Sequence, residues 1–217
     1  RGHAVLQDDQ KAGEENEATG LLTTATDVNR RKTRIAARWL DELGWETSLI
    51  ERRHFGDIPL LDADPAIVVT GLDSSDARLG IAKAGFDYMV DAGLGHGPVD
   101  FEGIQVRILK KDADLKNMWS APPKPRDVDA LLEGDAYKAH AADSDGCGTF
   151  DLAEASVAVP FVGAAAGALL IAQVIRLGSM LESIRIMQMD LASPEMVMTG
   201  GLNERPEASV GSVVLRM

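Results

Sequence analysis

The sequence of 217 residues has a single cysteine, Cys147, and only 5% of its residues are aromatic. One thiol cannot form an internal disulfide, and it cannot supply a four-thiolate zinc site. We therefore expect no structural zinc and a reducing, cytoplasmic setting. The scarcity of aromatic side chains predicts a core of small and aliphatic residues, as in many α/β proteins.

Basic residues are also in the minority, with 22 Lys and Arg against 34 Asp and Glu, a net charge of −12. A strongly acidic protein repels phosphate backbones, so nucleic acid is a poor candidate partner. This balance does not exclude ATP, because a few local cations and backbone amides can hold a nucleotide. The length suffices for one large domain with a sizeable core.

The longest apolar run, residues 155–175, has the length of a membrane span. Pro160 lies near one end of it, small residues dominate, and no basic cluster or aromatic belt flanks it. Gly163 and Gly167 form a G-x-x-x-G pair, which suits close helix packing in a soluble core as well as in lipid. We therefore expect residues 160–177 to form a buried helix and the protein not to use a membrane.

Apolar periodicity predicts strands that alternate with helices along the chain. The expected strands are residues 3–7, 47–51, 66–70, 88–91, 105–109, 184–191 and 196–199. The expected helices are residues 28–43 with Asp27 as cap and Gly44 at the end, a helix from 74–76 to about 85, short helices within 126–144, and 160–177. This order predicts an α/β fold, with a Rossmann-like, mostly parallel sheet, flanking helices and extra C-terminal strands.

Two acidic residues follow expected strands, at the sheet edge where α/β proteins bind ligands. Asp8, or its neighbour Asp9, is placed to hydrogen-bond ribose hydroxyls. Asp73 is placed to hold magnesium beside triphosphate oxygens. Each has a structural alternative, a solvated loop carboxylate for Asp8 and a helix cap for Asp73.

A lysine and the cysteine complete the candidate residues. Lys32 can reach a phosphate as a point charge, although a lysine on a helix is more often solvated. Cys147 lies between two glycines, which give access to a thiol that could attack an acyl-adenylate. The acidic residues near Cys147 disfavour its thiolate form, and an inert loop cysteine is the alternative.

Four stretches, in this order and spacing, resemble the ThiF/MoeB/HesA superfamily, whose fold is shared with ubiquitin-activating enzymes. They are residues 5–8 with Asn16, residues 19–22 with 27–32, residues 70–73 with Arg78, and residues 157–167 with 169–177. The resemblance implies that Asp8, Asn16, Lys32 and Asp73 bind ATP and Mg²⁺, with Asp73 as the metal ligand and a catalytic residue. It places Cys147 in the loop where relatives carry a catalytic thioester-forming or sulfur-handling cysteine.

The implied activity is ATP-dependent adenylation of the C-terminal glycine of a ubiquitin-like or sulfur-carrier β-grasp protein. Thioester formation or sulfur transfer at Cys147 would follow. Family members often dimerise, so the resemblance implies a homodimer or a heterodimer.

The sequence departs from the family pattern in several places. The family's glycine-rich phosphate loop is absent, so residues 1–217 read as a single ThiF-like adenylating domain whose first strand–helix unit is missing upstream of residue 1. Thr19 stands where a family arginine often contacts phosphates, and Ser74 replaces the usual asparagine. Two alternatives therefore stay open: a catalytically degenerate subunit of a heterodimer, and a nicotinamide-dependent Rossmann oxidoreductase, whose ribose Asp8 would also suit.

Overall fold

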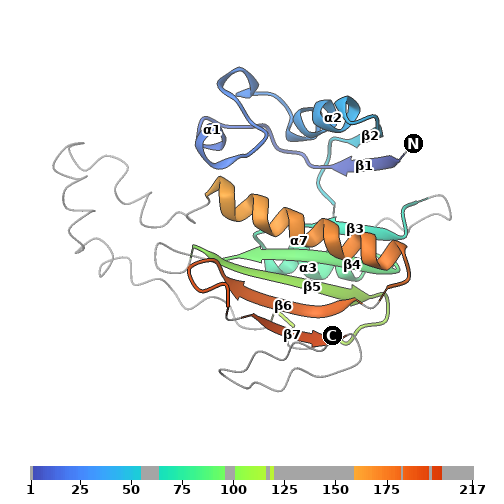
Figure 1. The fold of residues 1–217 in the computed structure, drawn as a ribbon. Helices are drawn as coiled ribbons and strands as arrows, with labels where there is room; N and C mark the ends of the chain where they lie inside the picture. The colour runs from blue at the N-terminus through green and yellow to red at the C-terminus, as the bar shows by residue number, and fades with distance from the viewer. Residues whose placement is uncertain are drawn as a thin grey trace.

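The computed structural model describes residues 2–54, 64–95, 101–115, 118–119, 159–181, 183–195 and 197–201. Within these residues the strands form a two-stranded sheet, β1-β2, and a five-stranded sheet in the order β3-β4-β5-β6-β7. Figure 1 shows the two-stranded unit on the β3 side of the larger sheet. The short helices expected within 126–144 lie outside the described residues.

The first unit is a strand–helix–strand arrangement. It consists of β1 (His3–Gln7), α1 (Glu15–Thr19), the 3₁₀ turn η1 (Ala25–Asp27), α2 (Lys32–Glu42) and β2 (Glu46–Ile50). β1 and β2 are parallel, with His3 opposite Glu46 and Gln7 opposite Ile50. α2 crosses between them and contacts both, with Ile35 buried on its inner face.

The helix expected at residues 28–43 begins later than predicted, at Lys32. Asn29 has a φ of 68°, a left-handed conformation that cannot continue a right-handed helix. Asp27 does not cap α2 but closes a capping box with Thr24 around η1. Gly44, at a φ of 82°, follows the end of α2 as expected.

The second unit contains the larger sheet. Its elements are β3 (Ile67–Thr70), α3 (Ser75–Ala82), β4 (Tyr88–Leu94), β5 (Gly103–Lys110), α7 (Pro160–Gly178), β6 (Ile184–Asp190) and β7 (Met198–Gly201). β3 and β4 are parallel, whereas the β4–β5, β5–β6 and β6–β7 pairs are antiparallel.

The α/β class is therefore confirmed, but the prediction of a mostly parallel sheet is wrong, because the larger sheet is mixed. The reason is visible between β4 and β5, which residues 95–102 connect. A parallel crossover needs about a dozen residues or more, so strands joined this closely pair antiparallel.

Two helices cover opposite faces of the larger sheet, α7 in front and α3 behind in Figure 1. Side chains alternate between the faces of a strand, so neighbours on β4 enter different cores. Val90 joins the core under α7, which includes Val162 and Leu170. Met89 joins the core under α3, which includes Ile81.

α7 has two different faces, which corrects the expectation of a helix buried all round. Val162 is fully buried, whereas Phe161, Ile171 and Ile175 are 55%, 53% and 59% exposed. Among the described residues, α7 is the one helix with the length and composition of a membrane span. The same composition suits a core helix, and one stripe of α7 does pack on β4 and β5.

Candidate functional site

The carboxyl end of β1 brings two of the predicted residues together. Asp8 follows the strand, and its Oδ1 accepts a hydrogen bond from the Gln10 amide at 2.7 Å. The side chain of Gln10 accepts one from Lys32 Nζ at 2.8 Å. The Lys32 amide also donates to the Gln10 carbonyl at 3.1 Å, so the start of α2 is fixed beside this strand end. Asp8 and Lys32 therefore both bond to Gln10, Asp8 to its main-chain amide and Lys32 to its side chain, and both are half-buried.

Asn16 lies in α1, after the loop that follows β1. Its Oδ1 accepts a hydrogen bond from the Gly13 amide at 3.0 Å. This bond orders the turn into α1. The ATP-binding role that the resemblance implies for Asn16 stays a prediction.

Asp73 lies in the connection from β3 to α3 and is exposed. The capping role considered for it belongs to Ser74, whose Oγ accepts a hydrogen bond from the Ala77 amide at 3.4 Å. Asp73 is therefore not used as a cap. It follows a strand of the larger sheet, and no hydrogen bond or ion pair within the described chain joins it to Asp8 or Lys32.

Cys147 and the glycine-rich segment around it lie outside the described residues. Its predicted role as a nucleophile therefore stays a prediction.

A buried carboxylate that the sequence analysis did not single out lies next to this connection. Asp91 on β4 is 3% exposed. It accepts a hydrogen bond from Thr70 Oγ1 at 2.7 Å, and Arg78 Nε lies 3.2 Å from its Oδ2. Burial raises the pKa of Asp91, although the Thr70 hydrogen bond and the Arg78 charge act against it.

The Asp91 network ties together the three elements around Asp73. Thr70 ends β3, Arg78 belongs to α3, and Asp91 and Ala92 lie on β4. Arg78 Nη2 also donates to the Ala92 carbonyl at 3.3 Å. Arg78 thus holds α3 against the sheet and fixes the connection that carries Asp73. The sequence signal for Asp91 was the presence of a carboxylate inside an otherwise apolar strand.

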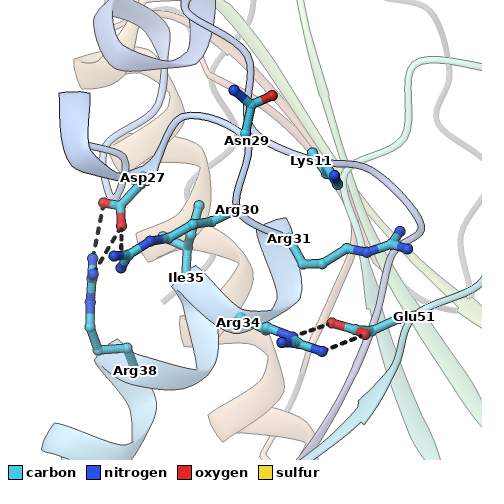
Figure 2. Close-up of a pocket in the computed structure, with 9 residues that line it drawn as sticks. All are labelled: Lys11, Asp27, Asn29, Arg30, Arg31, Arg34, Ile35, Arg38 and Glu51. Atoms are coloured by element: carbon cyan, nitrogen blue, oxygen red, sulfur yellow. Dashed lines mark hydrogen bonds and ion pairs between the residues drawn. The ribbon is translucent and has the colours of Figure 1, made fainter.

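A basic pocket lies beside the end of β1. It has a volume of about 590 Å³ and combines five cations with two carboxylates. We call it the basic pocket; the lining residues, drawn in Figure 2, are Lys11, Asp27, Asn29, Arg30, Arg31, Arg34, Ile35, Arg38 and Glu51. Four of its cations, Arg30, Arg31, Arg34 and Arg38, lie close together in sequence, and this spacing is the sequence signal for a charged wall.

Both carboxylates of the basic pocket are paired with arginines of α2. Arg34 binds Glu51 through Nε and Nη2 at 2.7 and 3.0 Å. Arg38 binds Asp27 through Nη1 and Nη2 at 2.9 and 3.1 Å. Hydrogen bonds from Arg38 and Thr24 hold the pKa of Asp27 far below its usual range, and Arg34 lowers the pKa of Glu51. Both carboxylates are therefore anionic at neutral pH.

Comparison with known proteins identifies the family. The model of the family described as the BilD C-terminal domain matches residues 1–180. The bacterial E1-like protein BilD of Collimonas sp. (strain OK412) is 34% identical over 174 residues, 79% of this chain and 37% of the relative. The chain thus spans little more than a third of the length of that relative.

Solved structures show the same fold at low sequence identity. E. coli MccB has a TM-score of 0.61 and 13% identity, covering 100% of this chain and 61% of MccB. MccB solved with ATP gives 0.60 and 16%, covering 97% and 59%. PaaA gives 0.52 and 12%, covering 90% and 63%. The chain has the E1-like fold predicted from its motifs, and it belongs to the BilD C-terminal domain family.

Proposed function

We propose that this chain is the adenylating part of an E1-like enzyme, which uses ATP and Mg²⁺ to activate the C-terminal glycine of a ubiquitin-like or sulfur-carrier β-grasp protein. The observation that carries the proposal is that Asp8 and Lys32 both hydrogen-bond to Gln10, at the carboxyl end of a parallel strand. A carboxylate and a cation at this edge suit the ribose and phosphates of one nucleotide. The family's E1-like relative and the likeness to MccB support ATP as that nucleotide.

Each predicted residue fits a role in binding ATP. Asp8 accepts hydrogen bonds from ribose hydroxyls, as acidic residues at such strand ends do. Lys32 exchanges the Gln10 oxygen for a phosphate oxygen and offsets the charge that grows in the transition state. Asn16 orders the loop after β1 that borders this position.

Asp73 has the chemistry of a Mg²⁺ ligand. In the described residues, no group of three or more His, Cys, Asp or Glu side chains could hold a metal ion. Mg²⁺ does not need such a cage, because one or two carboxylates with phosphate oxygens and water commonly suffice. Asp73 is exposed and free of a capping role, so its oxygens are available to the ion. The bound ion would neutralise charge on the phosphates.

The proposed reaction has two steps. A carboxylate oxygen of the carrier's C-terminal glycine attacks the α-phosphorus of ATP. The bond from that phosphorus to the bridging oxygen breaks, and pyrophosphate leaves. The Cys147 thiolate then attacks the acyl carbon, AMP leaves, and a thioester forms, or the acyl group passes to a sulfur-transfer step.

We further propose that a strand from the protein upstream of residue 1 lies between the two sheets. In the described residues, β1 pairs only with β2 and β3 only with β4. The two-stranded unit lies on the β3 side of the larger sheet (Figure 1). A Rossmann sheet in the order 3-2-1-4 would place its first strand at this position. That strand would bring the glycine-rich phosphate loop, and the greater length of BilD is consistent with such a segment.

ATP–pyrophosphate exchange tests the adenylating function. The full-length protein is incubated with ATP, Mg²⁺, labelled pyrophosphate and purified carrier proteins that end in glycine. We expect label to enter ATP only when a carrier is present, and not when its terminal glycine is removed. Absence of exchange with every carrier, from a full-length protein that is folded, would refute the adenylating function.

A degenerate subunit of a heterodimer is the second candidate, and two side chains favour it. The hydroxyl of Thr19, where a phosphate-contacting arginine is usual, donates to the Glu15 carbonyl at 2.8 Å. Ser74, where asparagine is usual, is used as the cap of α3. Co-purification with a second E1-like subunit, whose own nucleotide site alone supports exchange, would establish this candidate.

A further inference from the structure

We propose that the basic pocket is a second anion site, in which Lys11 and Arg31 bind the phosphate group of a small molecule. This site is separate from the proposed nucleotide edge, which is the carboxyl end of β1 with Asp8 and Lys32. The inference does not depend on adenylation. It depends on the placement of Lys11 and Arg31 on two short backbone segments that pair with each other.

Lys11 and Arg31 are partners in an isolated antiparallel β-bridge. Residues directly opposite each other project their side chains to the same face, and like charges in such a pair repel. Arg31 Nη1 donates to the Asp9 carbonyl, and no carboxylate in the described part of the chain forms an ion pair with Lys11 or Arg31. An anion between the two side chains would remove the repulsion.

The bridge also separates this pair from Lys32. Gln10 and Lys32 form the adjacent pair of the ribbon and are hydrogen-bonded through their side chains. Side chains alternate between faces along extended backbone, so Gln10 and Lys32 project away from Lys11 and Arg31. In agreement, Lys11 and Arg31 line the basic pocket, whereas Gln10 and Lys32 do not.

The remaining charges of the basic pocket neutralise Arg31 only in part, because Glu51, whose pKa the charge of Arg31 also lowers, is bonded to Arg34. Glu51 is paired with Arg34, and Asp27 with Arg38. Figure 2 shows the Asp27–Arg38 pair on the opposite side of the pocket from Arg31. Five cations and two paired carboxylates leave an excess of positive charge in a chain whose net charge is −12.

Phosphate is the anion that best matches this lining. A guanidinium presents paired donors to a phosphate, and an ammonium adds a compact charge. Ile35 is the one apolar residue of the lining, so the pocket offers little surface to a large ring system. Its volume of about 590 Å³ lies within the usual range for small-molecule sites.

Binding of inorganic pyrophosphate to the full-length protein, measured by titration calorimetry at low salt, tests the proposal. All variants carry Lys32→Ala, so that the proposed nucleotide edge does not contribute. We expect saturable binding that the added pair Lys11→Ala and Arg31→Ala weakens at least tenfold. Lys83→Ala with Lys111→Ala removes the same charge from exposed positions elsewhere, and we expect this control to change the affinity less than twofold.

Other outcomes would overturn the proposal. The first is that the Lys32→Ala protein shows no saturable binding of pyrophosphate, and the second is that the control pair weakens binding as much as the Lys11→Ala and Arg31→Ala pair. The third is an equal affinity for succinate, which would make the site one for carboxylates. Lys11→Gln alone, at an exposed position, guards against misfolding, and we expect it to weaken binding at least threefold. Pyrophosphate binding without ATP exchange would refute only the adenylating function, and exchange without this binding would refute only the second site.

Discussion

Asp27 and Arg38 form a two-hydrogen-bond ion pair in which the carboxylate is completely buried and the guanidinium is not. The two bonds measure 2.9 and 3.1 Å. The side chain of Asp27 is 0% exposed and that of Arg38 is 39% exposed. Thr24 and Arg30 donate to the same carboxylate, so Asp27 links η1 to the segment before α2 and, through Arg38, to α2 itself.

This pair predicts acid sensitivity. The pKa of Asp27 is lowered in the folded chain, whereas in an unfolded chain it is about 3.9. The pair therefore stabilises fully above that value, and its contribution falls as the pH drops below about 4. We expect Asp27→Asn to lower the thermal midpoint by several degrees at pH 7 and by clearly less at pH 3. An equal effect at both pH values would contradict the assignment of charge to Asp27.

The Asp91–Arg78 pair predicts a mutational defect that also shrinks in acid, but for a different reason. Arg78→Ala leaves a buried carboxylate without its cation, and we expect it to cost about 3–5 kcal/mol at pH 7. The pKa of Asp91 is already raised by burial, so lowering the pH protonates it and relieves this cost. Urea unfolding at pH 7 and near pH 4.5 should show the defect shrinking in acid. Arg53→Ala, at an exposed position, should stay within about 0.5 kcal/mol of the wild type.

Neighbouring residues on α7 provide a matched test of its docking on the sheet. Leu170 is 8% exposed and belongs to the core with Val90, whereas Ile171 is 53% exposed. We expect Leu170→Ala to lower the free energy of unfolding of the chain by about 2–5 kcal/mol. Ile171→Ala should change it by about 0.5 kcal/mol or less. Equal effects in denaturant titrations would mean that α7 does not pack with this face.

Substitution of Lys32 is expected to slow the exchange reaction without destabilising the fold. Its Nζ bonds only a loop glutamine in the described chain, so Lys32→Ala should leave the thermal midpoint almost unchanged. If Lys32 meets the phosphates in the transition state, exchange should fall about 100-fold. Lys83→Ala is the matched control. Normal exchange by Lys32→Ala would remove Lys32 from the nucleotide site.

Periodicity and turn residues were enough to predict much of the fold. The residues of β1 and the β-branched run of β3 fall where the sequence predicts them, because a strand with strong local preference needs little help from its surroundings. The predicted start of α2 was wrong because Asn29 has a left-handed conformation. Its amide donates a hydrogen bond to the carbonyl of Ala12, which is distant in sequence, and this bond stabilises the conformation. The antiparallel pairing of β4 with β5 was missed because both strands extend further toward each other than predicted, to Leu94 and from Gly103, which leaves a connection too short for a parallel crossover.

The candidate site was predictable only in part. Asp8 and Lys32 could be singled out as candidates because both follow recognisable patterns, an acidic strand end and a family-like helix start. The hydrogen bonds of both residues to Gln10 were not predicted, since glutamine carries no special signal at that position. Asp91 and the basic pocket depend on pairs between elements, such as Arg78 with β4 and Arg34 with Glu51. A sequence read one element at a time does not reveal such pairs.

The unpaired edges of β1 and β3 have a consequence for handling this chain. Each presents main-chain donors and acceptors that no other strand in the described residues satisfies, and Val69 on β3 is 45% exposed. Such edges recruit strands from other molecules. The 217-residue chain produced by itself should therefore self-associate with rising concentration, and a charged residue introduced at Val69 should improve its solubility.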